Sequence, residues 1–476
     1  MSKEEDDKPK PTDTDLLVAI GEKEAVLSQH RSKAYATVTT RRGRRTFQVL
    51  GPGCSTWLRL RFRDQYRRTP SAGAVKAAIT ALADLASLAD ETPVWLRSAW
   101  HEGRVYIDLG DESGCAIEIS ADGWRLTPFP PVLFVRSNLG LPLPRPGRDD
   151  DLDRLRGLLN IPDDATFQLI VTWCVAALMP HGPYPLITIG GEQGAGKTLL
   201  AGVLHALVDP SRLPLRALPR SERDLYIACS NTHVLAYDNI SKMPDWLSDA
   251  FCKVATGGGM ALRQVFSDDA EVYFSATKPI ILNAIEDVVT RPDLADRAII
   301  LNLPAIAEEK RIDPAEFAAR FEECRPEVFK TLLDLMSFAM AVMPTLQVER
   351  LPRMAGFARI GIAIEGCFGA PGCFMAAYDS NRAMASSIVA ESDPIVAPIR
   401  VLAATRPVWR GTATELASLL ETRLVPPRRL DPAALGGHLR RIAPILRADG
   451  IEISFSRDGK GRDRLITVAR ISSSKP

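Results

Sequence analysis

Residues 191–198, GEQGAGKT, have the spacing of a phosphate-binding loop, in which Gly191 is followed after four residues by Gly196, Lys197 and Thr198. In such a loop the backbone N–H groups cradle phosphate oxygens, the lysine reaches the β- and γ-phosphates, and the threonine hydroxyl binds Mg²⁺. Glycine suits these positions because it adopts backbone angles that are closed to other residues. A helix that opens at Lys197 would direct the positive end of its dipole toward the anion.

The flanks of this loop favour nucleotide binding over the alternative, a glycine-rich turn with a structural role. LITI at 186–189 reads as a buried strand, and TLLAGVLHALV at 198–208 has apolar residues at helical spacing. We therefore expect ATP and Mg²⁺ as cofactors. The expected ATP-binding residues are Gly191, Glu192, Gln193, Gly194, Ala195, Gly196, Lys197, Thr198 and Leu199.

Two later strand-like segments end in polar side chains that can take part in hydrolysis. HVLAYDNI at 233–240 ends with Asp238 and Asn239, and a carboxylate in this place can hold Mg²⁺. KPIILNAIE at 278–286 places Asn283 at a strand end beside the same crevice, where an amide can position the attacking water. The alternatives are a polar residue that caps a strand end, for Asp238, and a turn asparagine, for Asn283.

Two arginines follow in RPDLADRAIILNLP at 291–304. Arg291 or Arg297 could stabilise transition-state charge in the site of a neighbouring subunit, as arginine fingers do. Pairing with Asp293 or Asp296 on a surface turn is an equally open interpretation.

Composition indicates an ordinary globular protein. The chain has 476 residues, of which 46% are hydrophobic and 25% charged, so we expect about three domains. No long uninterrupted apolar run occurs and the N-terminus is acidic, which predicts neither signal peptide nor membrane anchor, and a cytoplasmic protein. Eight scattered cysteines and six histidines show no metal-ligand spacing, which predicts reduced thiols and no zinc.

Charge is segregated although the net charge is only +1. Residues 31–68 contain 11 Lys or Arg and one acid, and residues 395–476 contain 15 Lys or Arg and 7 acids. Two basic segments on either side of a near-neutral centre suggest surfaces that face a polyanion, although solvated strand and helix faces remain the alternative. Aromatic residues interleave with the first segment and allow either base stacking or a core: Tyr35, Phe47, Trp57, Phe62 and Tyr66.

The pattern of strands, helices and turn residues predicts an α/β chain in several parts. These are a disordered tail (1–14), an N-terminal α/β domain (15–141), a linker (142–151), a P-loop ATPase domain (152–305), a helical region (306–394) and a C-terminal domain (395–476). One segment, ATFQLIVTWCVAALM, is apolar nearly all round and should form a buried helix.

The order of these motifs resembles the ATPase of phage- and plasmid-type primase-helicases, the superfamily 3 branch of the AAA+ ring motors, over roughly residues 150–305. The most specific stretch is CKVATGGGMALRQVFSDDAEVYFSATKPIILN. In that family a helix that ends in a Thr-Gly-Gly turn leads to a β-hairpin, which projects into the pore of the ring and grips DNA. Here ALRQVF and EVYFSA alternate as strands do around the turn SDDA, and Arg263 lies on the first strand.

The resemblance implies a replication protein of a mobile element that assembles a ring, expected to be a hexamer, around single-stranded DNA. It assigns Lys197, Thr198 and Asp238 to the nucleotide and Mg²⁺, Asn283 to sensor 1 and Arg297 to the finger. Many AAA+ motors have a glutamate where this chain has Asn239. The catalytic base is therefore open between Asp238 and a more distant carboxylate such as Asp249.

The C-terminal segment also resembles a module of the same family, a winged helix. RPVWRGTATELASLLETRL and DPAALGGHLRRIAPILRADG read as helices, and GIEISFSRDGKGRDRLITVAR reads as two strands around a turn. Arg440, Arg441 and Arg447 would lie on the recognition helix for duplex DNA, with Arg457, Lys460 and Arg462 on the wing. A winged helix that docks protein is the alternative.

The N-terminal domain shows no primase constellation, which leaves room for a separate primase as a partner. Asp108 and Asp111 in DLGDES read better as a turn than as a metal pair. We therefore expect an ATP-dependent DNA helicase or translocase. A nucleotide-gated DNA-binding protein is the main alternative, and a P-loop kinase is disfavoured because it has no use for the hairpin or the basic ends.

Overall fold

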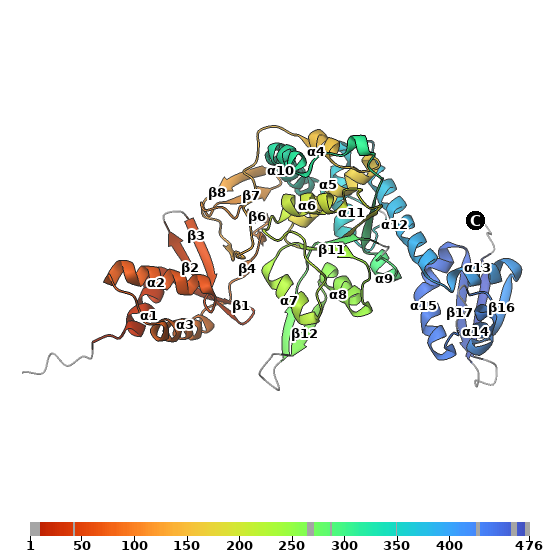
Figure 1. Cartoon of the computed structure of the whole chain (residues 1–476), viewed down its shortest axis with the longest axis horizontal. Helices are drawn as coiled ribbons and strands as arrows, with labels where there is room; N and C mark the ends of the chain where they lie inside the picture. Colours follow the sequence, from red (N-terminus) through yellow and green to blue (C-terminus); the bar gives the residue numbers. More distant parts are fainter. Residues whose placement is uncertain are drawn as a thin grey trace, which may run out of the picture.

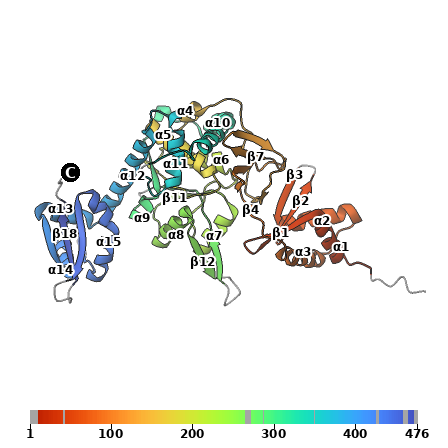
Figure 2. The same cartoon turned by 180° about the vertical axis from the view of Figure 1, so that it is seen from behind.

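The computed structural model describes residues 10–40, 43–263, 271–285, 288–348, 350–424, 429–457 and 464–471. Figure 1 shows an N-terminal unit at one end, a central body, and a C-terminal unit joined to the body through α12, and Figure 2 shows the same order from behind. Within the described part of the chain, no helix is both long and apolar enough to cross a membrane.

The N-terminal unit packs three helices on a small antiparallel sheet with strand order β1-β2-β3. Its elements are α1 (Asp13–Glu24), β1 (Ala25–His30), β2 (Lys33–Thr40), β3 (Gly43–Gln48), α2 (Pro52–Tyr66) and α3 (Ala72–Ser87). Leu17, Leu58, Phe62 and Leu82 lie in one buried core. Helix α3 covers most of GAVKAAITALADLASLA, the one run in this region whose apolar residues predict a helix.

Helices α1 and α2 were not predicted. In α2 the run LRLRFR alternates as a strand would, but the buried residues Cys54, Leu58 and Phe62 are four apart and so share one helix face. Helix α1 begins at Asp13, because Thr12 and Asp15 form a capping box. The last two residues of the segment 1–14, predicted to be a disordered tail, are therefore helical.

A second antiparallel sheet follows, with strand order β5-β6-β7-β8. Its strands are β5 (Ser98–His101), β6 (Arg104–Asp108), β7 (Ala116–Ser120) and β8 (Gly123–Thr127), and the short strands β4 (Val94–Trp95) and β9 (Leu133–Phe134) pair beside it. Val105, Ile107, Ile117 and Ile119 share a core with helices of the central body. This sheet is therefore packed against the body.

The central body is built on a parallel sheet with strand order β11-β14-β10-β15. The strands are β10 (Leu186–Gly191), β11 (Leu235–Ile240), β14 (Ile280–Ala284) and β15 (Ala298–Leu303), and the helices between and before them are α4 (Leu152–Leu158), α5 (Asp164–Leu178), α6 (Lys197–Val208), α7 (Glu222–Asn231), α8 (Asp245–Thr256) and α9 (Pro292–Ala295). The strands are buried because helices cover both faces. Helix α5 is buried at every position from 167 to 178, as predicted.

A hairpin of β12 (Gly259–Arg263) and β13 (Glu271–Ser275) extends from this body next to α7 (Figure 1), and its register pairs Arg263 with Glu271. The predicted turn SDDA lies outside the described residues. After β15 come α10 (Pro314–Val342), α11 (Ala355–Ile364) and α12 (Cys373–Ser392), with short 3₁₀ turns at Glu308–Lys310 and Glu365–Cys367.

The C-terminal unit consists of α13 (Val396–Thr405), β16 (Val408–Thr412), α14 (Ala413–Glu421), α15 (Pro432–Ala448), β17 (Ile451–Arg457) and β18 (Arg464–Arg470), with sheet order β16-β18-β17. The prediction that RPVWRGTATELASLLETRL is one helix is wrong at its start, because Val408–Thr412 pairs with β18. Thr412 and Glu415 form a capping box that starts the helix only at Ala413.

Candidate nucleotide-binding site

The loop between β10 and α6 has the backbone that its glycines permit. Gly191, Gly194 and Gly196 have φ angles of +128°, +82° and +84°. A Cβ atom at Gly191 would lie 2.5 Å from the carbonyl oxygen of Leu303, so a larger residue would clash as well as strain the backbone. Helix α6 begins at Lys197 without a side-chain cap on its N-terminus. Its first N–H groups can therefore serve an anion.

Lys197 folds back over this loop. Its Nζ atom donates hydrogen bonds to the carbonyl oxygens of Gly191, at 2.7 Å, and Glu192, at 2.9 Å. The ammonium group is thus held at the mouth of the loop by weak acceptors. An anion in the loop would offer it a stronger, charge-assisted partner.

Three polar side chains meet beside the loop: Asp238 and Asn283 near the carboxyl ends of adjacent strands, and Thr198 in the first turn of α6. The Nδ2 atom of Asn283 donates to the Thr198 hydroxyl at 3.0 Å and to the Asp238 carboxylate. Register explains the meeting, because β14 lies between β10 and β11 in the sheet. Asn283 is only 3% exposed, so its side chain is held firmly. Carboxylate and hydroxyl oxygens are ligands that Mg²⁺ accepts, and these residues fit a nucleotide with its metal.

Asn239 sits on a local irregularity at the end of β11. Its φ angle is +58°, and the pairing of β11 with β14 shifts between Tyr237 and Ile240. Asparagine tolerates this left-handed backbone better than most residues. Its N–H group donates to the Asp238 carboxylate at 2.8 Å while its side chain is exposed. The residue next to Asp238 therefore carries an amide, which cannot act as the catalytic base as a carboxylate in this position could.

Sequence reasoning missed Asn160, which precedes α5. Its Nδ2 atom donates to the carbonyl oxygens of Ala195, at 3.0 Å, and Pro304, at 2.7 Å. It therefore ties the glycine loop to the end of β15. No motif marks this asparagine, because its partners are backbone atoms brought close only by folding.

Arg297 and Arg291 are each paired within their own chain. Arg297 is only 7% exposed. Its guanidinium donates to the backbone carbonyl oxygen of Asp293 at 2.6 Å and pairs with the Asp293 carboxylate at 2.5 Å. Arg291 pairs with Asp249 at 2.8 Å. The structure thus brings together Lys197, Thr198, Asp238 and Asn283. Asp249, the alternative base, instead contacts Arg291.

The expected DNA contacts fall in different surroundings. The guanidinium of Arg440 lies 4.2 Å above the ring of the exposed Phe455, whereas Arg441 lines a cleft with Arg353 and Arg382. Arg447 pairs with Glu452 at 2.9 Å. Arg457 is exposed at the end of β17. Arg263 ends β12, and Lys460 and Arg462 lie outside the described residues.

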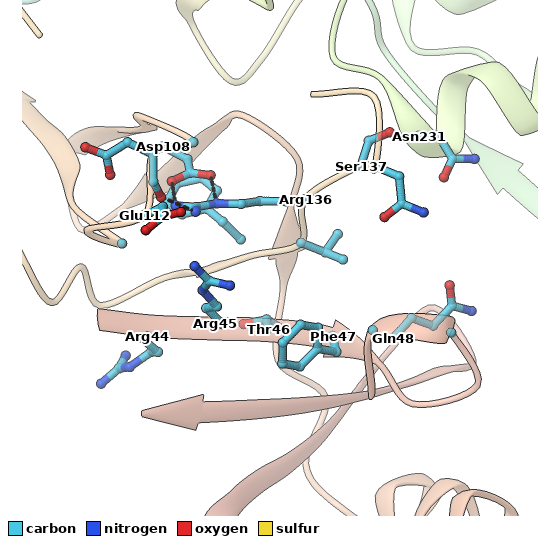
Figure 3. A pocket seen from close by; sticks show the side chains of 18 of the residues that line it. Arg44, Arg45, Thr46, Phe47, Gln48, Asp108, Glu112, Arg136, Ser137 and Asn231 are labelled. Carbon is cyan, nitrogen blue, oxygen red and sulfur yellow. Dashed lines mark hydrogen bonds and ion pairs between the residues drawn. The ribbon is translucent and has the colours of Figure 1, made fainter. Parts of the chain in front are cut away.

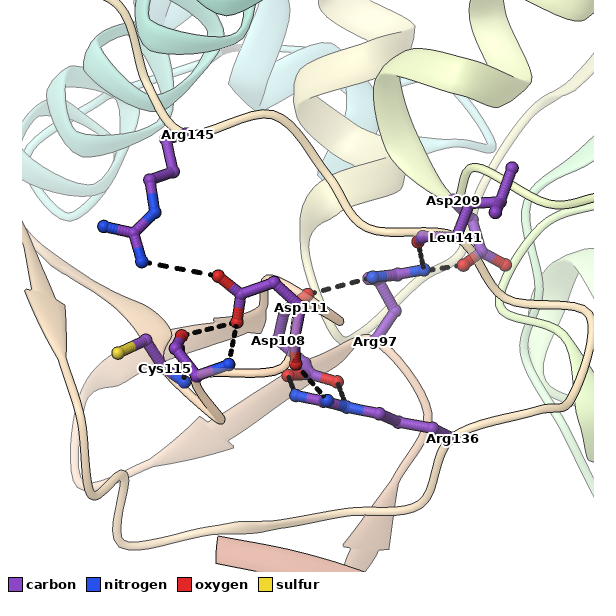
Figure 4. A network of polar contacts seen from close by, with 9 residues as sticks. Arg97, Asp108, Asp111, Cys115, Arg136, Leu141, Arg145 and Asp209 are labelled. Atoms are coloured by element: carbon purple, nitrogen blue, oxygen red, sulfur yellow. Dashed lines mark hydrogen bonds and ion pairs between the residues drawn. The ribbon is translucent and has the colours of Figure 1, made fainter. Parts of the chain in front are cut away.

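Asp108 ends β6 and pairs with Arg136, and Asp111 lies in the turn that follows, where the sequence had favoured a turn for both aspartates. Arg136 binds both oxygens of Asp108, at 2.6 and 2.8 Å, and an Asp111 oxygen accepts the N–H of Ser113 at 2.9 Å (Figure 4). Across the residues that the structure describes, no group of three His, Cys, Asp or Glu side chains could hold a metal.

The same region is joined to the body by a buried ion pair between Arg97 and Asp209, at 2.9 Å (Figure 4). Burial acts to raise the pKa of Asp209, but Arg97 and neighbouring donors outweigh it and lower this pKa to about 2. The carboxylate therefore stays charged and accepts N–H bonds from His233 and Val234 at the start of β11. This pair holds the second sheet in place.

A cavity of about 440 Å³ lies between β3 and the Asp108–Arg136 pair (Figure 3). Arg44 and Arg45 line one side, and Asp108, Glu112 and Arg136 line the other. Its walls carry both signs of charge and include none of the loop residues 191–198. This cavity is therefore separate from the candidate nucleotide site.

Two family models match the sequence, and both describe replication proteins of a mobile element. One, the actinomycete integrative conjugative element replication protein, matches residues 152–384, and the other, the RepA C-terminal domain of the same elements, matches residues 395–476. Together they match well over half of the chain, so the chain belongs to the family of actinomycete integrative conjugative element replication proteins. The predicted membership among mobile-element replication proteins is confirmed.

Solved structures with similar chains include the NrS-1 C-terminal region, at 10% identity and a TM-score of 0.44, covering 96% of this chain and 99% of that one. The SCCmec type IV Cch helicase is 11% identical with a TM-score of 0.49, covering 94% and 93%. JCV helicase is 12% identical with a TM-score of 0.23, covering 49% and 72%. No curated protein matches the sequence.

Gly191→Ala tests the strained backbone of the loop. We expect it to lower the free energy of unfolding by about 2 kcal/mol, because the new methyl group meets Leu303 and φ is positive. Gly202→Ala in α6 is the matched control. Nothing lies within 4 Å of a Cβ there, so it should stabilise the helix by roughly 0.5–1 kcal/mol. Urea denaturation measures both, and equal effects would contradict the strain.

Proposed function

We propose that this replication protein is an ATP-dependent DNA helicase or translocase that unwinds DNA during replication of its element. The observation that carries the proposal is the meeting of Asp238, Asn283 and Thr198 directly after the glycine loop. A glycine turn with only a structural role gives no reason for a carboxylate, an amide and a hydroxyl to converge there. Hydrolysis of the γ-phosphoryl group of ATP would supply the energy for movement.

Each residue then has a role that its position allows. The N–H groups of 191–199 and the Lys197 ammonium would bind the phosphates, and Thr198 and Asp238 would hold Mg²⁺. Asn283 would orient the attacking water, since its buried amide is already fixed between these two side chains. Asp238 would be the carboxylate that accepts a proton, because Asn239 cannot and Asp249 is paired with Arg291.

The ring is a further part of the proposal. A hexamer would place Arg297 of one subunit near the nucleotide of the next, where its charge would stabilise the transition state. In the single chain this arginine is bound to Asp293, so it would have to exchange that partner on assembly. Arg353, which lies 3.6 Å from Asp293, could then keep the carboxylate paired.

DNA would be contacted at two places. The hairpin with Arg263 would grip a single strand in the pore, and the C-terminal unit would bind duplex as a winged helix, with α15 as its recognition helix. Arg440 and Arg457 support this use of the unit because they are exposed beside Phe455 and β17. Arg447 pairs with Glu452 and would contribute less, whereas the exposed Arg441 lines a cleft with Arg353 and Arg382.

The test is the ATPase rate with and without single-stranded DNA. A translocase hydrolyses ATP faster when it is bound to DNA, so we expect a single-stranded oligonucleotide to raise the ATPase rate clearly. The alternative is a nucleotide-gated DNA-binding protein whose turnover is incidental, which Asn239 favours because it removes a base. Binding of DNA that depends on ATP, together with a slow and unstimulated ATPase, would establish that alternative.

A further inference from the structure

A cleft of about 560 Å³ lies between the N-terminal unit and the central body. Its lining includes the turn that joins β1 to β2, residues 93–96, 98 and 180–182, helix α7, and residues 276–278, which follow directly after β13. Figures 1 and 2 both show β1 and α7 close to the hairpin of β12 and β13. The cleft therefore opens beside the base of the hairpin.

The charge of this cleft is one-sided. Arg31, Lys33 and Lys278 line it, and none of the described residues that line it is Asp or Glu. Two carboxylates contact the lining from outside it. Glu91 lies 3.6 Å from His30 and accepts the N–H of Arg31, and Asp209, which is paired with Arg97, accepts the N–H of His233. The cleft thus presents three cationic side chains to whatever enters it.

Lys278 is the least satisfied of these cations. No hydrogen bond or ion pair of its ammonium group occurs with the described part of the protein, and burial lowers its pKa although Cys229 and Asp209 act to raise it. Keeping a charge in such a place is costly unless an anion pairs with it. The segment itself is held firmly, because Thr277 packs between Gly182 and Gly257, each too close to admit a Cβ atom.

Aromatic side chains share the same walls. Trp95, Tyr35 and Tyr226 line the cleft, and the Lys33 ammonium lies 5.7 Å from the centre of the Tyr226 ring. Trp95 makes an edge contact with His181, at 5.7 Å between ring centres. Cations that follow a backbone, next to rings on which bases stack, are the two components of sites for single-stranded nucleic acid.

We propose that this cleft binds single-stranded DNA, with phosphates at Arg31, Lys33 and Lys278 and bases against Trp95 and Tyr226. The strand at the hairpin would continue into it and so reach the N-terminal unit. This inference rests on the proposed function, because it needs DNA at the hairpin. It joins part of the basic segment 31–68 to Lys278, which no motif in the sequence marks, and it gives the N-terminal unit a role in binding DNA.

The first test uses the full chain and a fluorescein-labelled oligothymidylate, with affinity measured by anisotropy across a range of salt. Lys33→Ala and Lys278→Gln should each weaken binding several-fold and reduce the slope of log affinity against log salt by about 0.7, as expected for one lost phosphate contact. The control is Lys76→Ala, an exposed lysine on α3 that lines none of these walls. It should leave both quantities unchanged.

The second test needs no variant and so does not depend on whether one folds. An oligonucleotide that carries 5-iododeoxyuridine is cross-linked to the wild-type chain by light, and adducts are mapped by mass spectrometry. Adducts on Trp95 or Tyr226 support the cleft. DNA binding with adducts only elsewhere and unchanged salt slopes would overturn the cleft but leave the helicase proposal intact, whereas no DNA binding by the wild type would overturn both.

Discussion

We expect Lys197→Ala to abolish ATP hydrolysis while the chain keeps its fold. The reason is that, among the residues that the structure describes, the Lys197 ammonium contacts only the carbonyl oxygens of Gly191 and Glu192, and water can replace it there at a cost of about 1 kcal/mol. With ATP bound it would face the phosphates, where loss of a stabilising charge costs on the order of 10²–10³ in rate or more. The phosphate-release rate at saturating ATP measures this loss.

Lys76→Ala is the control for that experiment, since it removes an exposed lysine of the N-terminal unit and should leave the rate unchanged. Thermal melting of both variants shows whether the fold is kept. If Lys197→Ala hydrolyses ATP as fast as the wild type, the loop 191–198 is a structural turn and the nucleotide site must be sought elsewhere.

A mixture of two inactive variants regains activity if the ring has composite sites. Arg297→Ala keeps an intact glycine loop, and Lys197→Ala keeps an intact finger, so an interface that combines these two halves is complete. At equal mixing, roughly a quarter of the interfaces in a randomly assembled ring are complete. We therefore expect the ATPase rate to pass through a maximum near equal proportions, at up to about that share of the wild-type rate.

The structure supplies a matched control, because Arg353 contacts the same aspartate, Asp293, at 3.6 Å, and also Asp296 at 3.2 Å. If Arg297 acts only by pairing with Asp293, then Arg353→Ala should resemble Arg297→Ala and neither should complement Lys197→Ala. Light scattering in the presence of DNA verifies that the variants assemble together. A flat, inactive profile in mixtures that do assemble would refute a finger at Arg297 and make Arg291 the next residue to test.

Local patterns were sufficient wherever neighbours in the chain decide the outcome. The alternation of LITI, the helical spacing after it and the glycines between them predicted β10, α6 and their loop, because backbone angles and burial of one face depend on nearby residues. Asp238 and Asn283 could also be named, since each follows a run of apolar residues. Family membership followed from the order of these motifs along the chain.

Patterns of the same kind misled where two periods fit one segment. Helix α2 was not predicted, because LRLRFR alternates and shows no helical period, and Val408–Thr412 was read as part of a helix although it pairs with β18. In both places the choice between helix and strand depends on which side chains are buried, and the core that buries them is made by residues far away in the chain. Composition within the segment does not hold this information.

The sequence by itself determined the glycine loop, the strands that end in Asp238 and Asn283, and the family to which the chain belongs. Only the tertiary structure decided that Asn283 lies between Thr198 and Asp238, that Asn160 ties the loop to β15, and that Arg297 pairs with Asp293. It also decided that Lys33 and Lys278 line one cleft. The physical reason is that strand register and helix packing set distances between residues far apart in the chain, whereas a motif reports only spacing along it.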